Sequence, residues 1–241
     1  MQNATHLSEP PPPPPPVAPP RHHLPAIPPR GALVAGITLL LLAAGIGLML
    51  RGDRPPFFEG LDERWLVWTT GARTGTASDL ARDLDRLGGP LGLVLPFGLI
   101  GCLCVYGRWR SAVFVFTSAV LANILVILPL KQVVDRPRPP RPWVLVNSGS
   151  FPSGEVFTAT TLVIAVAVVA FRPRARRWWW LIGGSYVAAM MWSRTWLHAQ
   201  WLSDTVAGLL AGAGTGLLLW LAFAPLLRGE AVRAAADRLW E

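Results

Sequence analysis

The chain has 241 residues, of which 52% are hydrophobic and 15% are charged, and its formal net charge is +8. Long apolar runs free of charge are typical of a protein that crosses a membrane several times, rather than of a soluble domain. In such proteins excess arginine more often marks cytoplasmic loops than nucleic-acid binding, and no nucleic-acid-binding motif is visible. We therefore expect an integral membrane protein without a nucleic-acid partner.

The first 30 residues are rich in proline and include an unbroken run from Pro10 to Pro16. Proline fixes φ and lacks a backbone N–H, so this segment favours an extended polyproline II conformation. We expect residues 1–30 to form a disordered cytoplasmic tail. Such a run is more often a spacer than a binding site for a cytoplasmic, proline-reading partner.

Six apolar segments follow, each near the length of about 20 residues that crosses a hydrocarbon core. They are Ala32–Leu50, Leu91–Tyr106, Ala112–Leu130, Val156–Phe171, Trp178–Trp192 and Val206–Leu227. The predicted fold is all-α, a polytopic membrane bundle of about six transmembrane helices within residues 31–228. Residues 229–241 are expected to form a short cytoplasmic C-terminal tail.

Arginine sets the expected orientation. If the N-terminus is cytoplasmic, every cytoplasmic segment contains arginine, as the positive-inside rule requires. These arginines are Arg21, Arg30, Arg108, Arg110, Arg172, Arg174, Arg176, Arg177, Arg228, Arg233 and Arg238. We expect both termini in the cytoplasm and the protein in the plasma membrane. The basic segment Lys131–Arg141 then lies outside, where it needs another explanation.

The first outer loop, Phe57–Gly89, is too polar to span the membrane. Its apolar residues Leu61, Trp65 and Trp68 recur near helical spacing beside charged residues. This pattern fits a helix that lies along the membrane surface, and it fits a solvated connection equally well.

Polar side chains lie at four ends of the predicted spans, all on the extracytoplasmic side. They are Lys131 after the third span, Ser153 before the fourth, Arg194 after the fifth and Asp204 before the sixth. Helix ends that converge on one side can share a single site. We therefore expect a pocket at the extracytoplasmic face.

The residue types in this pocket suit a phosphate group. Lys131, Arg138 and Arg194 supply cationic donors, and an arginine fork can chelate two oxygens. Ser153 and Gly154 add a hydroxyl and backbone N–H groups at a helix N-terminus, where an anion is favoured. We call these five residues the cradle. On charge alone, cations that snorkel to the membrane interface explain the pattern as well.

Spacing favours the phosphate interpretation. The motifs are Lys131-x6-Arg138-Pro139, then Pro152-Ser153-Gly154, then Ser193-Arg194 with Asp204 ten residues beyond the arginine. This order resembles the signature of the type 2 phosphatidic acid phosphatase family, shared with bacterial lipid phosphatases and vanadate-dependent haloperoxidases. The resemblance covers roughly Leu91 to Leu227. It implies a six-helix membrane fold that hydrolyses lipid phosphomonoesters or pyrophosphates without a metal or other cofactor.

The same resemblance implies a role for each site residue. The five cradle residues match phosphate-binding positions, and Asp204 matches the carboxylate that orients the nucleophile. Two positions depart from the pattern. Glu155 stands where a histidine usually protonates the leaving group, and Gln200 stands where a histidine attacks phosphorus. A carboxamide has no basic lone pair for that attack, so the phosphohistidine route should be closed.

The predicted catalytic set is Glu155, Gln200, Asp204 and His198. On a regular helix His198 would lie on roughly the opposite face from Gln200, whereas in a loop it could turn toward the phosphate. Glu155 has three candidate roles: a protonated general acid, a base that activates water, or a carboxylate paired with Arg138 or Arg194. The last role requires no catalysis.

Two functional hypotheses follow from the sequence. In the first, the protein hydrolyses a prenyl or glycerolipid phosphate or pyrophosphate at the extracytoplasmic side by an altered mechanism. In the second, it is a non-catalytic descendant that binds lipid phosphate or serves as a membrane scaffold.

Overall fold

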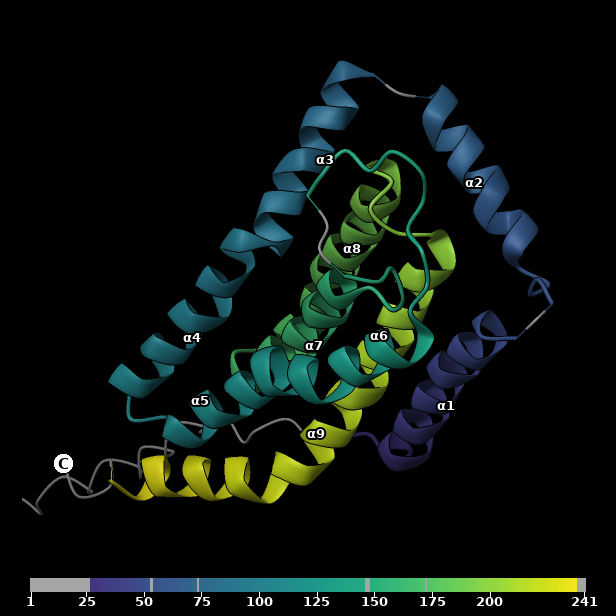
Figure 1. The fold of residues 1–241 in the computed structure, drawn as a ribbon. Helices are drawn as coiled ribbons and strands as arrows, with labels where there is room; N and C mark the ends of the chain where they lie inside the picture. The colour runs from purple at the N-terminus through teal and green to yellow at the C-terminus, as the bar shows by residue number, and fades with distance from the viewer. Residues whose placement is uncertain (1–26, 53, 73, 146–147, 172, 238–241) are drawn as a thin grey trace, which may run out of the picture.

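The structure, a computed structural model, describes residues 27–237 except 53, 73, 146–147 and 172 (Figure 1). Nearly all of the predicted proline-rich tail therefore lies outside the described residues. Within them every regular element is a helix, which confirms the predicted all-α membrane fold. The α-helices are α1 (Ala32–Leu50), α2 (Glu59–Gly71), α3 (Gly75–Gly88), α4 (Val94–Val105), α5 (Trp109–Phe116), α6 (Leu128–Val134), α7 (Gly154–Val169), α8 (Pro173–Trp196) and α9 (Leu202–Asp237).

The predicted spans correspond to α1, α4, the helical stretch from α5 to α6, α7, α8 and α9. Between α5 and α6 the chain stays helical through two π-helical segments, Thr117–Leu121 and Asn123–Ile127. Among the described helices, three are long and apolar enough to cross a membrane: Ala32–Leu50, Trp109–Val134 and Leu202–Arg233. Because α4 and α7 are shorter apolar helices, a count of six spans stays a prediction.

Helix α9 is the central packing element, with α1 and α7 along its sides (Figure 1). Glycine on α9 allows α7 to approach closely. A Cβ atom at Gly208 would lie 2.5 Å from the carbonyl oxygen of Ser153, and one at Gly212 would lie 2.8 Å from that of Phe157. The two backbones therefore touch, which brings the start of α9, with Asp204, beside the start of α7.

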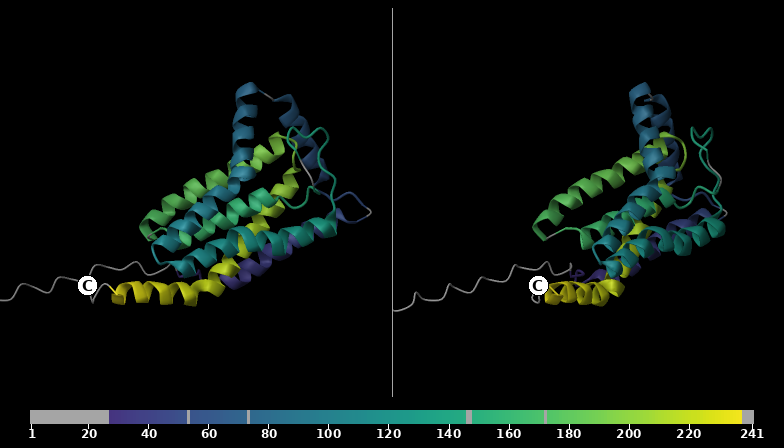
Figure 2. Two further views of the ribbon diagram at one scale, coloured as in Figure 1. Left: turned by 60° about the vertical axis from the view of Figure 1, so that its left-hand side comes forward. Right: turned by 90° about the vertical axis from the view of Figure 1, so that its left-hand side faces the viewer.

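The segment between α1 and α4 contains the helices α2 and α3, whose upper ends approach each other in Figure 1. Figure 2 shows α3 continuing toward α4 in both further views. On α2, Leu61 and Trp68 are exposed, whereas Asp62 and Thr69 are buried. Most of the segment Phe57–Gly89 is thus helical, and the side of α2 that carries Asp62 and Thr69 faces the rest of the protein.

The start of α1 and the last turns of α9 lie at the same end of the bundle (Figure 1). Helix α9 contains Pro225 and bends in its last third, as expected for a proline that removes a helical hydrogen bond. Beyond the bend, the Glu230 carboxylate accepts hydrogen bonds from the backbone N–H groups of Arg110 (2.8 Å) and Ser111 (3.1 Å). The helix runs through the predicted boundary at residue 228 without a break, and the assignment of residues 229–241 as a cytoplasmic tail stays a prediction.

Candidate functional site

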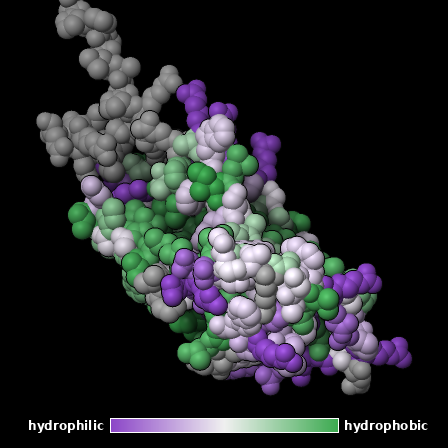
Figure 3. Space-filling view, turned by 90° about the horizontal axis from the view of Figure 1, so that it is seen from above, coloured by the Kyte–Doolittle hydropathy of each residue, from purple (hydrophilic) through white to green (hydrophobic). Residues whose placement is uncertain are grey.

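The three sequence motifs meet at the end of the bundle opposite to the start of α1 (Figure 1). Backbone hydrogen bonds join them. Ser150 donates from its N–H to the carbonyl oxygen of Arg136 (2.8 Å), and Ser153 donates to that of Asp204 (3.0 Å). The end seen from above in Figure 3 mixes hydrophilic, neutral and hydrophobic residues. The predicted convergence of distant helix ends is therefore present in the structure.

The second motif forms the N-terminus of α7. Ser153 is the N-cap, and its fully buried hydroxyl accepts a hydrogen bond from the N–H of Val156 at 3.3 Å. Serine is favoured at this position because its oxygen satisfies one of the free N–H groups at a helix start. The Ser153 hydroxyl thus serves the helix itself, and the neighbouring Gly154 faces the groove described below.

Lys131 and Arg138 hold the loop before α7. The Lys131 ammonium donates to the carbonyl oxygen of Gly149 at 2.7 Å. Arg138 donates to the carbonyl oxygens of Ser148 (2.8 Å), Gly149 (3.3 Å) and Ala199 (2.5 Å). Lysine carries three N–H donors and arginine five, so both residues retain donors for a ligand. Burial lowers the pKa of the Arg138 guanidinium, and the nearby Glu155 carboxylate opposes that shift.

Arg194 lies between two carboxylates. It forms ion pairs with Asp85 on α3 and, at 3.2 Å, with Glu155 on α7. Its side chain is only 4% exposed, and its Nε has no hydrogen-bond partner among the described residues. Two acidic neighbours therefore offset the charge of this cradle residue within the protein itself.

Glu155 and Gln200 contact each other. The Gln200 amide donates to the second carboxylate oxygen of Glu155 at 3.3 Å and, at 3.5 Å, to the carbonyl oxygen of Ser150. The amide oxygen of Gln200 is buried and has no hydrogen-bond partner among the described residues. The Glu155 carboxylate is thus paired with Arg194 and Gln200. This is the third of the roles considered from the sequence.

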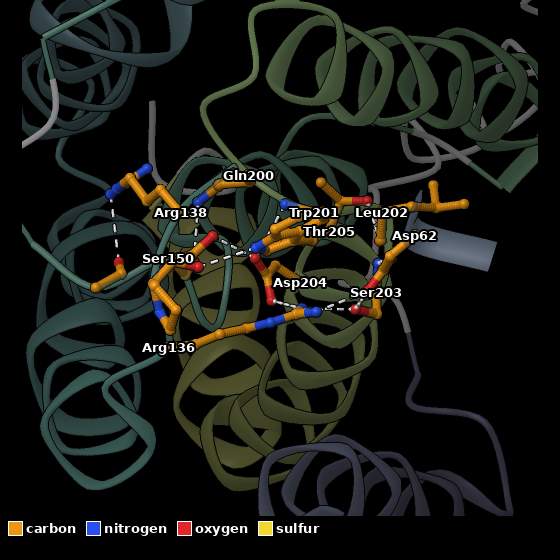
Figure 4. Close-up of polar contacts among 12 residues, drawn as sticks. Asp62, Arg136, Arg138, Ser150, Gln200, Trp201, Leu202, Ser203, Asp204 and Thr205 are labelled. Carbon is orange, nitrogen blue, oxygen red and sulfur yellow. Dashed lines mark hydrogen bonds and ion pairs between the residues drawn. The ribbon is translucent and has the colours of Figure 1, made fainter. Parts of the chain in front are cut away.

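Asp204 belongs to a second buried network, which meets the contacts of Gln200 at Ser150 (Figure 4). It pairs with Arg136 at 2.6 Å and accepts hydrogen bonds from the Ser150 hydroxyl and the Trp201 N–H. Arg136 also pairs with Asp62 of α2 at 2.8 Å. Asp62 in turn accepts hydrogen bonds from the N–H (2.8 Å) and hydroxyl (2.5 Å) of Ser203. Asp204 is therefore engaged by an arginine and a serine.

The position of His198 does not support a catalytic role. Helix α8 ends at Trp196, and His198 lies in a turn with φ of 54°, so the regular-helix alternative is wrong. The loop alternative is correct, and the imidazole contacts two residues outside the cradle. Its two nitrogens contact the carbonyl oxygen of Pro140 (3.3 Å) and the hydroxyl of Thr70 (3.2 Å).

Five residues that complete the site were not predicted from the sequence. They are Asp62, Asp85, Arg136, Ser150 and Ser203. The unbalanced basic segment Lys131–Arg141 was a signal for Arg136, because an unexplained arginine near a predicted carboxylate is a candidate ion-pair partner. No sequence signal distinguished Asp62 or Asp85 from the other acidic residues of the outer loop.

A groove of about 400 Å³ runs from the cradle along the helical stretch between α5 and α6. Its polar lining comprises Asn123, Lys131, Arg138, Ser148, Glu155 and Thr158. Its apolar lining includes Leu93, Val120, Ile124, Ile127 and Leu128. A cationic group of residues joined to an apolar channel is suited to an amphiphile, with its anionic head at the cradle and its tail along the helix.

Comparison with protein families finds that residues 111–228 match the PAP2 superfamily. Among solved structures, the fold is similar to the crystal structure of the first transmembrane PAP2 type phosphatidylglycerolphosphate phosphatase from Bacillus subtilis. The two chains share 20% sequence identity with a TM-score of 0.65, over 80% of this chain and 95% of the other. A comparison with curated proteins gives no significant match.

Proposed function

Since residues 111–228 match the PAP2 superfamily, we propose that the protein binds the phosphate group of a membrane lipid without hydrolysing it through a phosphohistidine. One observation carries the proposal. The carboxylate of Glu155, at the position of the usual acid, is paired with Arg194 and with Gln200, at the position of the usual nucleophile. The two positions that should perform the chemistry therefore bind each other.

Phosphate binding is supported by the donors that remain. Lys131 and Arg138 line the groove and keep N–H donors beyond those used by the loop carbonyls. The N-terminus of α7 adds the positive end of a helix dipole at Gly154. The apolar half of the groove would hold the lipid chain. This combination supports a lipid phosphate, of either the glycerolipid or the prenyl class, as the ligand.

The loss of the phosphohistidine route is supported by three further observations. Gln200 lacks a basic lone pair. Asp204, which should orient a nucleophile, is engaged by Arg136 and Ser150. His198 contacts Thr70 and Pro140, which lie outside the cradle. No group at these positions is arranged to attack phosphorus.

We place the groove at the extracytoplasmic face of the plasma membrane, with both termini in the cytoplasm. The arginines of the predicted cytoplasmic segments support this orientation. So does the position of the cradle at the end of the bundle opposite to the start of α1. The proline-rich tail would then lie in the cytoplasm as a spacer or as the ligand of a cytoplasmic partner.

The proposal is tested by measuring lipid binding and phosphate release with the same purified protein in detergent. Phosphatidate and a polyprenyl phosphate are compared with diacylglycerol of the same chain length, which has no phosphate. We expect at least one lipid phosphate to bind, diacylglycerol not to compete with it, and no phosphate to be released. Equal binding of diacylglycerol would overturn phosphate recognition, and release of phosphate would overturn the loss of catalysis.

A further inference from the structure

We propose that the cradle selects a lipid whose phosphate carries one negative charge, a phosphodiester, over a phosphomonoester that carries two. This inference rests on the proposed function, because it concerns the ligand of the same groove. The usual ligand expected from three cationic side chains is a dianion. The structure adds carboxylates that change this expectation.

The charges around the cradle nearly balance. Lys131, Arg138 and Arg194 contribute three positive charges. Glu155 and Asp85, both paired with Arg194, contribute two negative charges. One net positive charge remains for the ligand. The adjacent network carries a net charge of −1, because its one arginine, Arg136, is shared by the two carboxylates Asp62 and Asp204. The cradle, its two carboxylates and this network together therefore have no net positive charge to stabilise the second charge of a dianion.

The position of Glu155 decides which of these charges a ligand in the groove meets first. Glu155 lines the groove together with Lys131 and Arg138, whereas Arg194 does not line it. The side chain of Glu155 is 27% exposed and that of Arg194 only 4%. A phosphate that enters the groove therefore meets the Glu155 carboxylate in front of the Arg194 guanidinium. Glu155 already pairs with one nitrogen of this guanidinium as an anion supplied by the protein.

The two ligand classes differ in how strongly this carboxylate repels them. A phosphomonoester loses its second proton near pH 6 and is largely dianionic at pH 8, whereas a phosphodiester keeps a single charge. Each additional ligand charge near a carboxylate is disfavoured in a partly buried site. Lys131 and Arg138 match a single charge without displacing Glu155 from Arg194.

The test uses two lipids with identical acyl chains at pH 8, phosphatidate and phosphatidylmethanol, which differ by one methyl group and one charge. Binding to the purified full-length protein in detergent is measured by competition with a fluorescent phosphatidylmethanol. We expect phosphatidylmethanol to bind about tenfold more tightly than phosphatidate. With Glu155→Gln, phosphatidate should gain about tenfold and phosphatidylmethanol should change little.

Two further variants keep the test decisive. Glu63→Gln removes an exposed carboxylate of α2 outside the cradle and should leave both affinities unchanged. Asp85→Asn removes the other carboxylate partner of Arg194 and should shift the preference between the two lipids in the same direction. It replaces Glu155→Gln in the test if that variant fails to fold. Phosphatidate binding to the unaltered protein as tightly as phosphatidylmethanol would overturn the inference. Absence of binding by both lipids would instead overturn the proposed function, and the inference with it.

Discussion

Replacing Arg136 by methionine is expected to destabilise the folded protein by about 3–5 kcal/mol, because the change leaves two buried carboxylates without their common cation. The side chain of Arg136 is 10% exposed, and those of Asp62 and Asp204 are 2% and 0% exposed. Methionine retains most of the side-chain volume but none of the N–H donors. For a chain of this length, the loss should lower the midpoint of thermal unfolding in detergent by about 6–20 °C.

Matched variants separate this effect from a general sensitivity to arginine loss. Arg64→Met removes an exposed arginine of α2 and should shift the midpoint little. Asp62→Asn should cost less than Arg136→Met, since Arg136 keeps Asp204, and the double variant should cost less than the sum of the two. A midpoint for Arg136→Met within 2 °C of the unaltered protein, as about half a kcal/mol would give, would contradict the role assigned to this network.

Replacing Lys131 by methionine should weaken lipid phosphate binding by roughly 10–150-fold. Lys131 lines the groove and uses one of its N–H donors on the carbonyl oxygen of Gly149. A hydrogen bond to a charged group contributes about 1.5–3 kcal/mol, which corresponds to this loss of affinity. The measurement is the dissociation constant for the lipid phosphate that binds the unaltered protein most tightly.

Arg141→Met is the control for this prediction. Arg141 is an exposed cation in the same basic segment, Lys131–Arg141, but it does not line the groove. Its loss should lower affinity less than threefold. If both variants weaken binding equally, the protein attracts lipid through general surface charge, and the cradle has no specific role.

The sequence was sufficient to predict the helical membrane fold and the meeting of the three motifs. Apolar runs must leave water, and their lengths limit how they can cross a bilayer. Given the topology, Lys131, Ser153 and Arg194 had to lie at the same end of the bundle. These predictions depend on positions along the chain, which helix geometry converts directly into positions in space.

The electrostatic partners in the site could not be predicted in this way. Asp62 and Asp85 lie in the segment between α1 and α4, outside residues 111–228, and they reach Arg136 and Arg194 only because α2 and α3 fold back over the bundle. The packing of such a loop depends on many weak contacts that leave no periodic pattern. The contact between His198 and Thr70 could not be predicted from the sequence either. It depends on a turn in which the backbone of His198 has a positive φ.

The most direct test of the central claim is phosphate release by the purified protein, measured with phosphatidate and a polyprenyl pyrophosphate in detergent. A Gln200→His, Glu155→His double variant, which restores both family histidines, serves as the active counterpart. We predict that the unaltered protein releases no phosphate above a blank without protein and that the double variant does. Release by the unaltered protein that is lost in Glu155→Gln would contradict the claim, because Glu155 would then be a catalytic group.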